Sequence, residues 1–174
     1  MVSTDAAAGP DAAVWAAAAT VVDPEMPMLT LADLGVLRRV DATVDGTVRV
    51  SITPTYSGCP ALEAMHDDLR RALHDAGYDR VEVRTVFSPP WSTDRISEDG
   101  RRMLAEHGLA PPDRVGPRRT GPVPLTLAPP VGVVRCPQCG SPDTELISRF
   151  GANACTALRR CTACSEPFEH VKEI

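Results

Sequence analysis

Five of the six cysteines lie within 35 residues, between positions 134 and 168, and four of them form two CxxC pairs. A CxxC turn places two thiolates side by side, and two such turns can complete the closed four-sulfur shell that structural zinc prefers. The spacing therefore predicts a structural zinc site made by Cys136, Cys139, Cys161 and Cys164.

The spacing leaves other uses of these thiols open. Rubredoxin-type iron or an iron–sulfur cluster would suit the same four sulfurs. A thioredoxin-like redox pair is disfavoured, because neither CxxC follows a strand and opens a long helix. Cys155 stands between the pairs. It is either a small buried thiol that packs the domain or a contact or alternative ligand at the junction with a partner.

The segments around the pairs predict a small sheet. Residues 143–150, 156–161 and 167–172 have strand character, so we expect a three-stranded zinc ribbon over residues 134–174. About 40 residues bury too little apolar surface to fold alone, so zinc would supply much of the folding free energy.

A proline-rich stretch, residues 111–133, precedes the ribbon and disfavours both helix and sheet pairing. We interpret it as a linker or as an extended strap. It would separate the ribbon from a first domain over residues 1–110.

The first domain shows alternating helix and strand patterns. Helices are predicted over residues 11–19, 60–77 and 97–108, and strands over residues 36–41, 47–53 and 81–87, with an Asp45-Gly46 hairpin signal. The order helix-strand-strand-helix-strand-helix indicates a small α/β sandwich, so the whole chain is expected to be α+β with a C-terminal ribbon.

Cys59 lies between a predicted strand and the best predicted helix, next to Gly58. Backbone amides of a first helical turn face outward there, a setting that lowers the pKa of a thiol and exposes it for metal binding or nucleophilic attack. The alternative is an inert cysteine that fills the turn. Asp23 and Glu25, in the loop "DPEMP", are either part of a functional site or simply turn-forming residues.

The bulk properties exclude several classes of function. The net charge is −5, and the segment from residue 134 onward has five basic and five acidic residues, which argues against nucleic-acid binding. No segment approaches the ~20 apolar residues that span a membrane. The N-terminus is a poor signal peptide, so we expect a cytoplasmic protein. With no Ser/His/Asp constellation, we expect no enzymatic activity of its own.

Two sets of motifs carry a family resemblance. "DPEMPMLTLADLGVLRRV" and "TPTYSGCPALEAM" resemble the iron–sulfur assembly domain of SufT-type proteins. "SPPWSTDRISEDGRRMLAEHGLAPP" and "NACTALRRCTAC" resemble the PaaD (PaaJ) family, the accessory D subunits of the phenylacetyl-CoA epoxidase system.

This resemblance implies an accessory role in aerobic phenylacetate degradation, where a multicomponent 1,2-phenylacetyl-CoA epoxidase attacks the aromatic ring. It points to maturation of the iron–sulfur cluster in the flavoprotein reductase, with the other epoxidase subunits as partners. On the family pattern, Cys59 is the candidate thiol for a transient cluster or iron, with Asp23 and Glu25 beside it.

Two other classes stay open. The chain could be a non-catalytic scaffold or docking module that uses the ribbon as its interaction surface. A thiol oxidoreductase that uses Cys59 or Cys155 is disfavoured.

Overall fold

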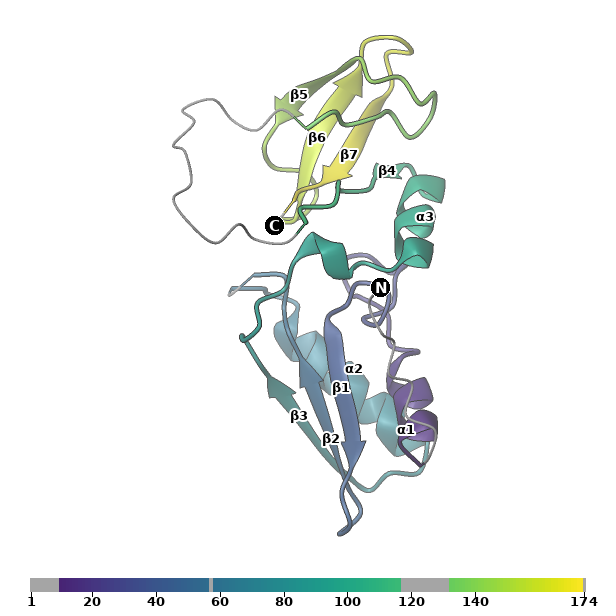
Figure 1. Cartoon of the computed structure of the whole chain (residues 1–174), viewed down its shortest axis with the longest axis vertical. Helices are drawn as coiled ribbons and strands as arrows, with labels where there is room; N and C mark the ends of the chain where they lie inside the picture. Colours follow the sequence, from purple (N-terminus) through teal and green to yellow (C-terminus); the bar gives the residue numbers. More distant parts are fainter. Residues whose placement is uncertain (1–9, 57, 117–131, 174) are drawn as a thin grey trace. The chain divides into compact units, whose positions relative to one another are not determined.

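The computed structural model describes residues 10–56, 58–116 and 132–173. The chain divides into two compact units, and the boundary in the sequence lies between Trp91 and Ser92 (Figure 1).

The first unit is a two-layer α/β structure. Its elements are α1 (Pro10–Ala18), β1 (Leu37–Ala42), β2 (Thr47–Ile52), α2 (Leu62–Asp75) and β3 (Arg80–Thr85). The sheet order is β1-β2-β3. β1 and β2 form an antiparallel hairpin, whereas β3 runs parallel to β2 after the crossover through α2.

Side-chain periodicity explains this packing. On β2, Val48, Val50 and Ile52 are buried, because alternate residues of a strand face the same side of the sheet. Helix α2 buries a stripe at helical spacing that includes Leu69 and Leu73. Each such buried aliphatic side chain stabilises the fold by roughly 1.5–3 kcal/mol.

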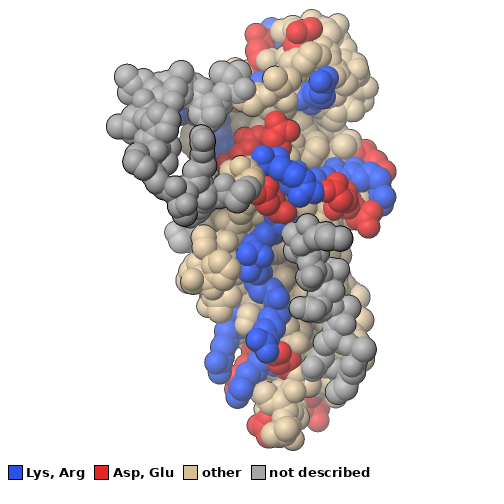
Figure 2. Space-filling view, in the orientation of Figure 1, with Lys and Arg blue, Asp and Glu red and all other residues tan. Residues whose placement is uncertain are grey.

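The opposite face of the sheet is charged, and Figure 2 shows basic side chains along it. These arginines lie beside carboxylates: Arg39 is 2.6 Å from Asp41, and Arg49 and Arg84 lie 3.4 and 2.7 Å from Glu82. Exposed pairs of this kind contribute little stability. We therefore interpret this face as solvated.

The second unit contains η1 (Thr93–Arg95), α3 (Glu98–Glu106), β4 (Leu109–Ala110), β5 (Thr144–Ser148), β6 (Thr156–Cys161) and β7 (Pro167–Val171). The last three strands form an antiparallel sheet, and β4 adds to it in parallel beside β7, in the order β4-β7-β6-β5. Ser97 is the N-cap of helix α3, and its Oγ accepts the Gly100 N–H at 2.9 Å.

The predicted α+β class and the order of elements are confirmed. The ribbon differs in one respect, since β4 makes its sheet four-stranded rather than three-stranded. Through β4, residues 92–116 group with the ribbon. The division into a first domain (residues 1–110), a linker (111–133) and a ribbon (134–174) stays a prediction. Most of the predicted linker, residues 117–131, lies outside the described residues.

Among the described residues, no helix has the length and apolar character needed to cross a membrane.

Candidate functional site

The first CxxC pair lies on a tight turn before β5. The N–H of Gly140 donates to the carbonyl of Cys136 at 2.8 Å, and the N–H of Cys136 donates to the carbonyl of Ser141 at 3.0 Å. Gly140 has a φ of +74°, which a residue with a side chain rarely adopts. This glycine lets the chain reverse directly after Cys139.

The second pair lies on the turn between β6 and β7 and repeats this arrangement. The N–H of Cys161 donates to the carbonyl of Glu166 at 2.9 Å. Ser165, which follows Cys164, has a φ of +65° where the first turn uses glycine. The N–H of Thr162 also donates to the carbonyl of Asp143 at 2.8 Å, which fastens the second turn to the start of β5.

The two turns bring the four predicted ligands together. Their sulfurs lie within 4.8 Å of one another, with 3.8 Å between Cys136 and Cys164 and 3.6 Å between Cys139 and Cys161. Tetrahedral zinc with Zn–S bonds of ~2.3 Å requires sulfurs about 3.8 Å apart. A disulfide needs about 2.05 Å, and all four cysteines are free. The donor set and its spacing therefore fit a four-coordinate metal ion.

The thiols also differ in acidity. Backbone N–H groups, first that of Cys164, lower the pKa of the Cys161 thiol to about 7. For Cys164 the Glu166 N–H acts in the same direction, but desolvation and the neighbouring thiols prevail and raise its pKa to about 12. Thiols this close cannot all ionise unless a cation balances their charge. A bound divalent ion would supply that charge.

Cys155 lies apart from the four ligands. It is buried, just before the start of β6, whereas Cys161 ends that strand. At ~3.3 Å per residue the strand separates them by about 20 Å. Its N–H donates to Asn153 Oδ1 at 3.0 Å, and its carbonyl accepts the Lys172 N–H at 2.9 Å. These are backbone contacts, and it is the burial of Cys155 that is consistent with a thiol that packs the domain.

Cys59 lies half-buried in the turn between β2 and α2, as predicted. Its carbonyl accepts the N–H of Leu62, the first residue of α2, at 3.3 Å. The N-cap of this helix is Ala61, which offers no side-chain hydrogen bond. The first amides of α2 are thus not capped by the N-cap side chain, the setting expected for a thiol that handles metal.

Asp23 is almost fully buried, with 4% of its surface exposed, in the loop after α1. Its Oδ1 accepts the N–H groups of Glu25 and Met26, each at 2.8 Å. Burial raises the pKa of Asp23 despite these two hydrogen bonds. Asp23 therefore holds the turn, and Glu25 lies half-exposed beside it.

The topology brings these two predicted segments to one end of the first sheet. The loop with Asp23 leads into β1 at Leu37, which pairs with Ile52 at the end of β2. From there the chain continues directly towards Cys59. The Thr53 N–H donates to the Val36 carbonyl at 2.9 Å, which joins the two segments at this end.

Sequence reasoning placed Thr53 at the end of a strand but missed its burial. Only 1% of Thr53 is exposed, and its Oγ1 has no hydrogen-bond partner among the described residues. Successive residues of a strand point to opposite faces, so Thr53 would be expected on the solvent side when Ile52 is buried. The one available signal was the sequence Thr53-Pro54-Thr55 directly before the Cys59 turn.

Comparison with known proteins matches two separate parts of the chain. The description "iron-sulfur cluster assembly protein" matches residues 11–85, and "PaaD zinc beta ribbon domain" matches residues 121–172. A crystal structure of a domain of unknown function, DUF59, from Bacillus anthracis has a TM-score of 0.50 and 27% identity. It covers 54% of this chain and 90% of its own.

Relatives of the first unit alone are named as maturation factors. The Fe-S protein maturation auxiliary factor of Porphyromonas gingivalis is 37% identical over 49% of this chain and 81% of its own length. The auxiliary factor SufT of Staphylococcus aureus is 32% identical over 48% of this chain and 96% of its own.

One relative spans both units. A protein of Escherichia coli (strain K12), described as the D subunit of 1,2-phenylacetyl-CoA epoxidase, is 42% identical over 91% of this chain and 90% of its own. The chain thus combines an iron–sulfur assembly domain with a PaaD-type ribbon, and it belongs to the PaaD family of phenylacetyl-CoA epoxidase D subunits.

Proposed function

We propose that this chain is an accessory subunit of a ring-epoxidising 1,2-phenylacetyl-CoA epoxidase that assists iron–sulfur cluster assembly in the reductase component. One observation carries the proposal: an iron–sulfur assembly unit and a four-cysteine ribbon are joined in a single chain. The names of the relatives support each half of this role.

In this role the two groups of thiols do different work. Cys136, Cys139, Cys161 and Cys164 would hold a structural zinc ion, which leaves none of these four sulfurs available for transfer. Cys59, on the turn before α2, whose N-cap side chain makes no hydrogen bond, is the proposed thiol for a transient cluster or iron. Asp23 would keep the adjacent loop in shape, with the Glu25 carboxylate nearby in sequence.

The test is to express the reductase component with and without this chain and to measure iron and acid-labile sulfide per reductase. We expect lower cluster content when the chain is absent, and the same loss with Cys59→Ser. Cys155→Ser is the matched control, because this thiol also lies outside the four-cysteine site but belongs to the other unit. Equal cluster content in all samples would contradict the proposal.

The scaffold alternative has one observation in its favour. Leu146, Ile147 and Phe150, at and just beyond β5, have 48%, 52% and 73% of their surfaces exposed. If the ribbon served only for docking, the chain would co-purify with the epoxidase subunits while the cluster content of the reductase stayed unchanged.

A further inference from the structure

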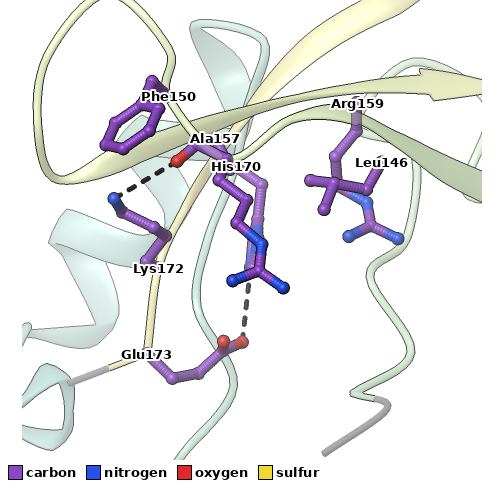
Figure 3. Close-up of a pocket in the computed structure, with 8 residues that line it drawn as sticks. Leu146, Phe150, Ala157, Arg159, His170, Lys172 and Glu173 are labelled. Carbon is purple, nitrogen blue, oxygen red and sulfur yellow. Dashed lines mark hydrogen bonds and ion pairs between the residues drawn. The ribbon is translucent and has the colours of Figure 1, made fainter. Parts of the chain in front are cut away.

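The ribbon sheet carries a cavity of about 350 Å³ at the end remote from the cysteine turns, shown in Figure 3. This volume is within the range of sites for small organic ligands, roughly 300–1,000 Å³. The lining combines three apolar side chains, three basic side chains and the pair of His170 and Glu173.

Strand register assembles this cavity. Ala157 pairs with His170 across β6 and β7, and Arg159 pairs with Leu146 across β6 and β5. Alternate residues of a strand share a face, so the strand spacing also places Lys172 beside His170. The buried Ala157 has the smallest side chain of the lining, so it leaves space for the cavity above the sheet.

The cavity concentrates positive charge. Three of the five basic residues after position 134, Arg149, Arg159 and Lys172, line it, although this segment is neutral overall. Within the described part of the chain, none of the three lies within 4 Å of a carboxylate. The Arg159 guanidinium donates to Thr144 Oγ1 at 3.2 Å, and the Lys172 ammonium donates to the Arg149 carbonyl at 3.4 Å.

The neighbouring Arg160 behaves differently. It points to the other face of β6, where its guanidinium lies 2.5 Å from the Glu145 carboxylate. Arg159 and Lys172 thus donate to neutral acceptors, whereas Arg160 is paired with an acid, so their positive charges stay available for an anion.

The one acid of the cavity is already engaged. Oε1 of Glu173 lies 3.3 Å from Nε2 of the buried His170 and accepts the Asp113 N–H at 3.4 Å. Figure 3 marks this interaction between Glu173 and His170 with a dashed line. The remaining lining carries a net positive charge.

An apolar wall completes the cavity. The Phe150 ring is 73% exposed, and the Lys172 ammonium lies 5.5 Å from its centroid. Leu146 adds an exposed aliphatic side chain on β5. A ligand that joins an oxyanion to an apolar group would use both kinds of lining.

We propose that this cavity binds a small organic oxyanion, a phosphate ester or a carboxylate, whose apolar part contacts Phe150 and Leu146. A guanidinium group can bind two oxygens of either anion through a pair of parallel charge-assisted hydrogen bonds. The proposal is independent of any role of the chain in cluster assembly.

The experiment is an NMR titration of the zinc-loaded full chain, labelled with ¹⁵N. The probes are phenyl phosphate, benzoate, inorganic phosphate and, as a cation with the same apolar group, benzylamine. We expect saturable shifts at residues 146–150, 157–159 and 170–173 with phenyl phosphate or benzoate, at a Kd of about 1 mM or below. The anion that binds more tightly identifies the head group.

Variants then locate the site. Arg149→Gln should weaken binding about tenfold, because it removes one charge-assisted contact. Lys172→Gln is the second variant. Lys172 is chosen in place of Arg159 because the Arg159 guanidinium donates hydrogen bonds within the sheet, so its loss would also disturb the fold. Phe150→Ala should weaken the binding of phenyl phosphate but not the binding of inorganic phosphate. Arg160→Gln, on the opposite face, is the matched control and should change nothing.

Three outcomes would overturn the proposal. They are the absence of saturable shifts up to about 20 mM of either aromatic anion, equal binding of benzylamine, and equal losses in Arg149→Gln and Arg160→Gln.

Discussion

The indole N–H of Trp91 donates a 2.8 Å hydrogen bond to the carbonyl oxygen of Leu34, 57 residues earlier in the chain. Both side chains are buried, and Gly35 continues the chain with a φ of +66°. This bond joins the two sequence motifs that suggested the family, since Leu34 belongs to Asp33-Leu34-Gly35 and Trp91 opens Trp91-Ser92-Thr93. It holds the last segment of the first unit against the loop that leads into β1.

Loss of this bond should destabilise the first unit. Trp91→Phe keeps an aromatic ring but leaves the buried Leu34 carbonyl without its donor, which costs about 1–3 kcal/mol. Urea unfolding measures the change. Trp15→Phe is the control, because Trp15 is 39% exposed and a surface change stays within about 0.5 kcal/mol. Equal stability of the two variants would show that the hydrogen bond contributes nothing.

The four-cysteine site should bind one metal ion and support only the ribbon. We expect one zinc per chain by elemental analysis, and loss of it when any ligand, for example Cys136, is changed to Ser. Cys155→Ser should retain the metal, since this thiol lies at the far end of β6.

Chelation of the zinc should unfold the ribbon strands while the first unit stays folded. Metal binding typically contributes about 10–16 kcal/mol to such small domains. Loss of NMR dispersion for residues 134–173, with residues 10–56 unaffected, is the expected result. Simultaneous loss from both units would contradict it.

Zinc binding should release protons. In the zinc-free chain, whose ribbon strands are unfolded, the four thiols have the ordinary pKa of about 8.5 and are mostly protonated at pH 7. All ligands bind as thiolates, so at least two protons leave per zinc. Calorimetry in buffers of different ionisation enthalpy counts them. The apparent affinity should rise with pH from 6 to 8, and a pH-independent affinity would rule out this ionisation scheme.

Much of the fold and the metal site could be predicted because both depend on local spacing. Val48, Val50 and Ile52 show the period of a half-buried strand, and two CxxC pairs need only a turn each to form a donor set. The pairing of Leu109 and Ala110 with β7 could not be predicted, since two residues carry no periodicity.

The cavity was missed for a related reason. Arg149, Arg159 and Lys172 come from three separate stretches of the chain, and only the strand register brings them together. His170 lies on β7 and is buried, with 5% of its surface exposed. The burial of His170 depends on its neighbours in β4 and β6, and the local sequence around His170 does not reveal them.

The two interpretations of Asp23 can be separated by paired substitutions. Asp23→Ala leaves the buried N–H groups of Glu25 and Met26 without an acceptor, so we expect a loss of about 1–3 kcal/mol. Asp23→Asn keeps an oxygen acceptor. Because burial raises the pKa of Asp23, a neutral amide should be tolerated with little change in unfolding free energy. If Asp23→Asn is as stable as wild type yet fails to support cluster loading, the carboxylate has a role beyond the turn.

The Glu173 carboxylate should stabilise the ribbon in a defined range of pH. The nearby His170 ring, whose Nε2 lies 3.3 Å from its carboxylate, lowers the pKa of Glu173 from 4.5 to about 2. A group whose pKa is lower in the folded state supplies stability that is complete above about pH 4.5 and is lost as the pH falls towards 2. Because 38% of its side chain is exposed, solvent screening limits this contribution to about 1 kcal/mol. Glu173→Gln should therefore lower the unfolding free energy of the zinc-loaded chain by that amount, equally at pH 6 and pH 8. Glu145→Gln, at the exposed pair with Arg160, is the control. A Glu173→Gln deficit that grows between pH 6 and 8 would mean that another group titrates in its place.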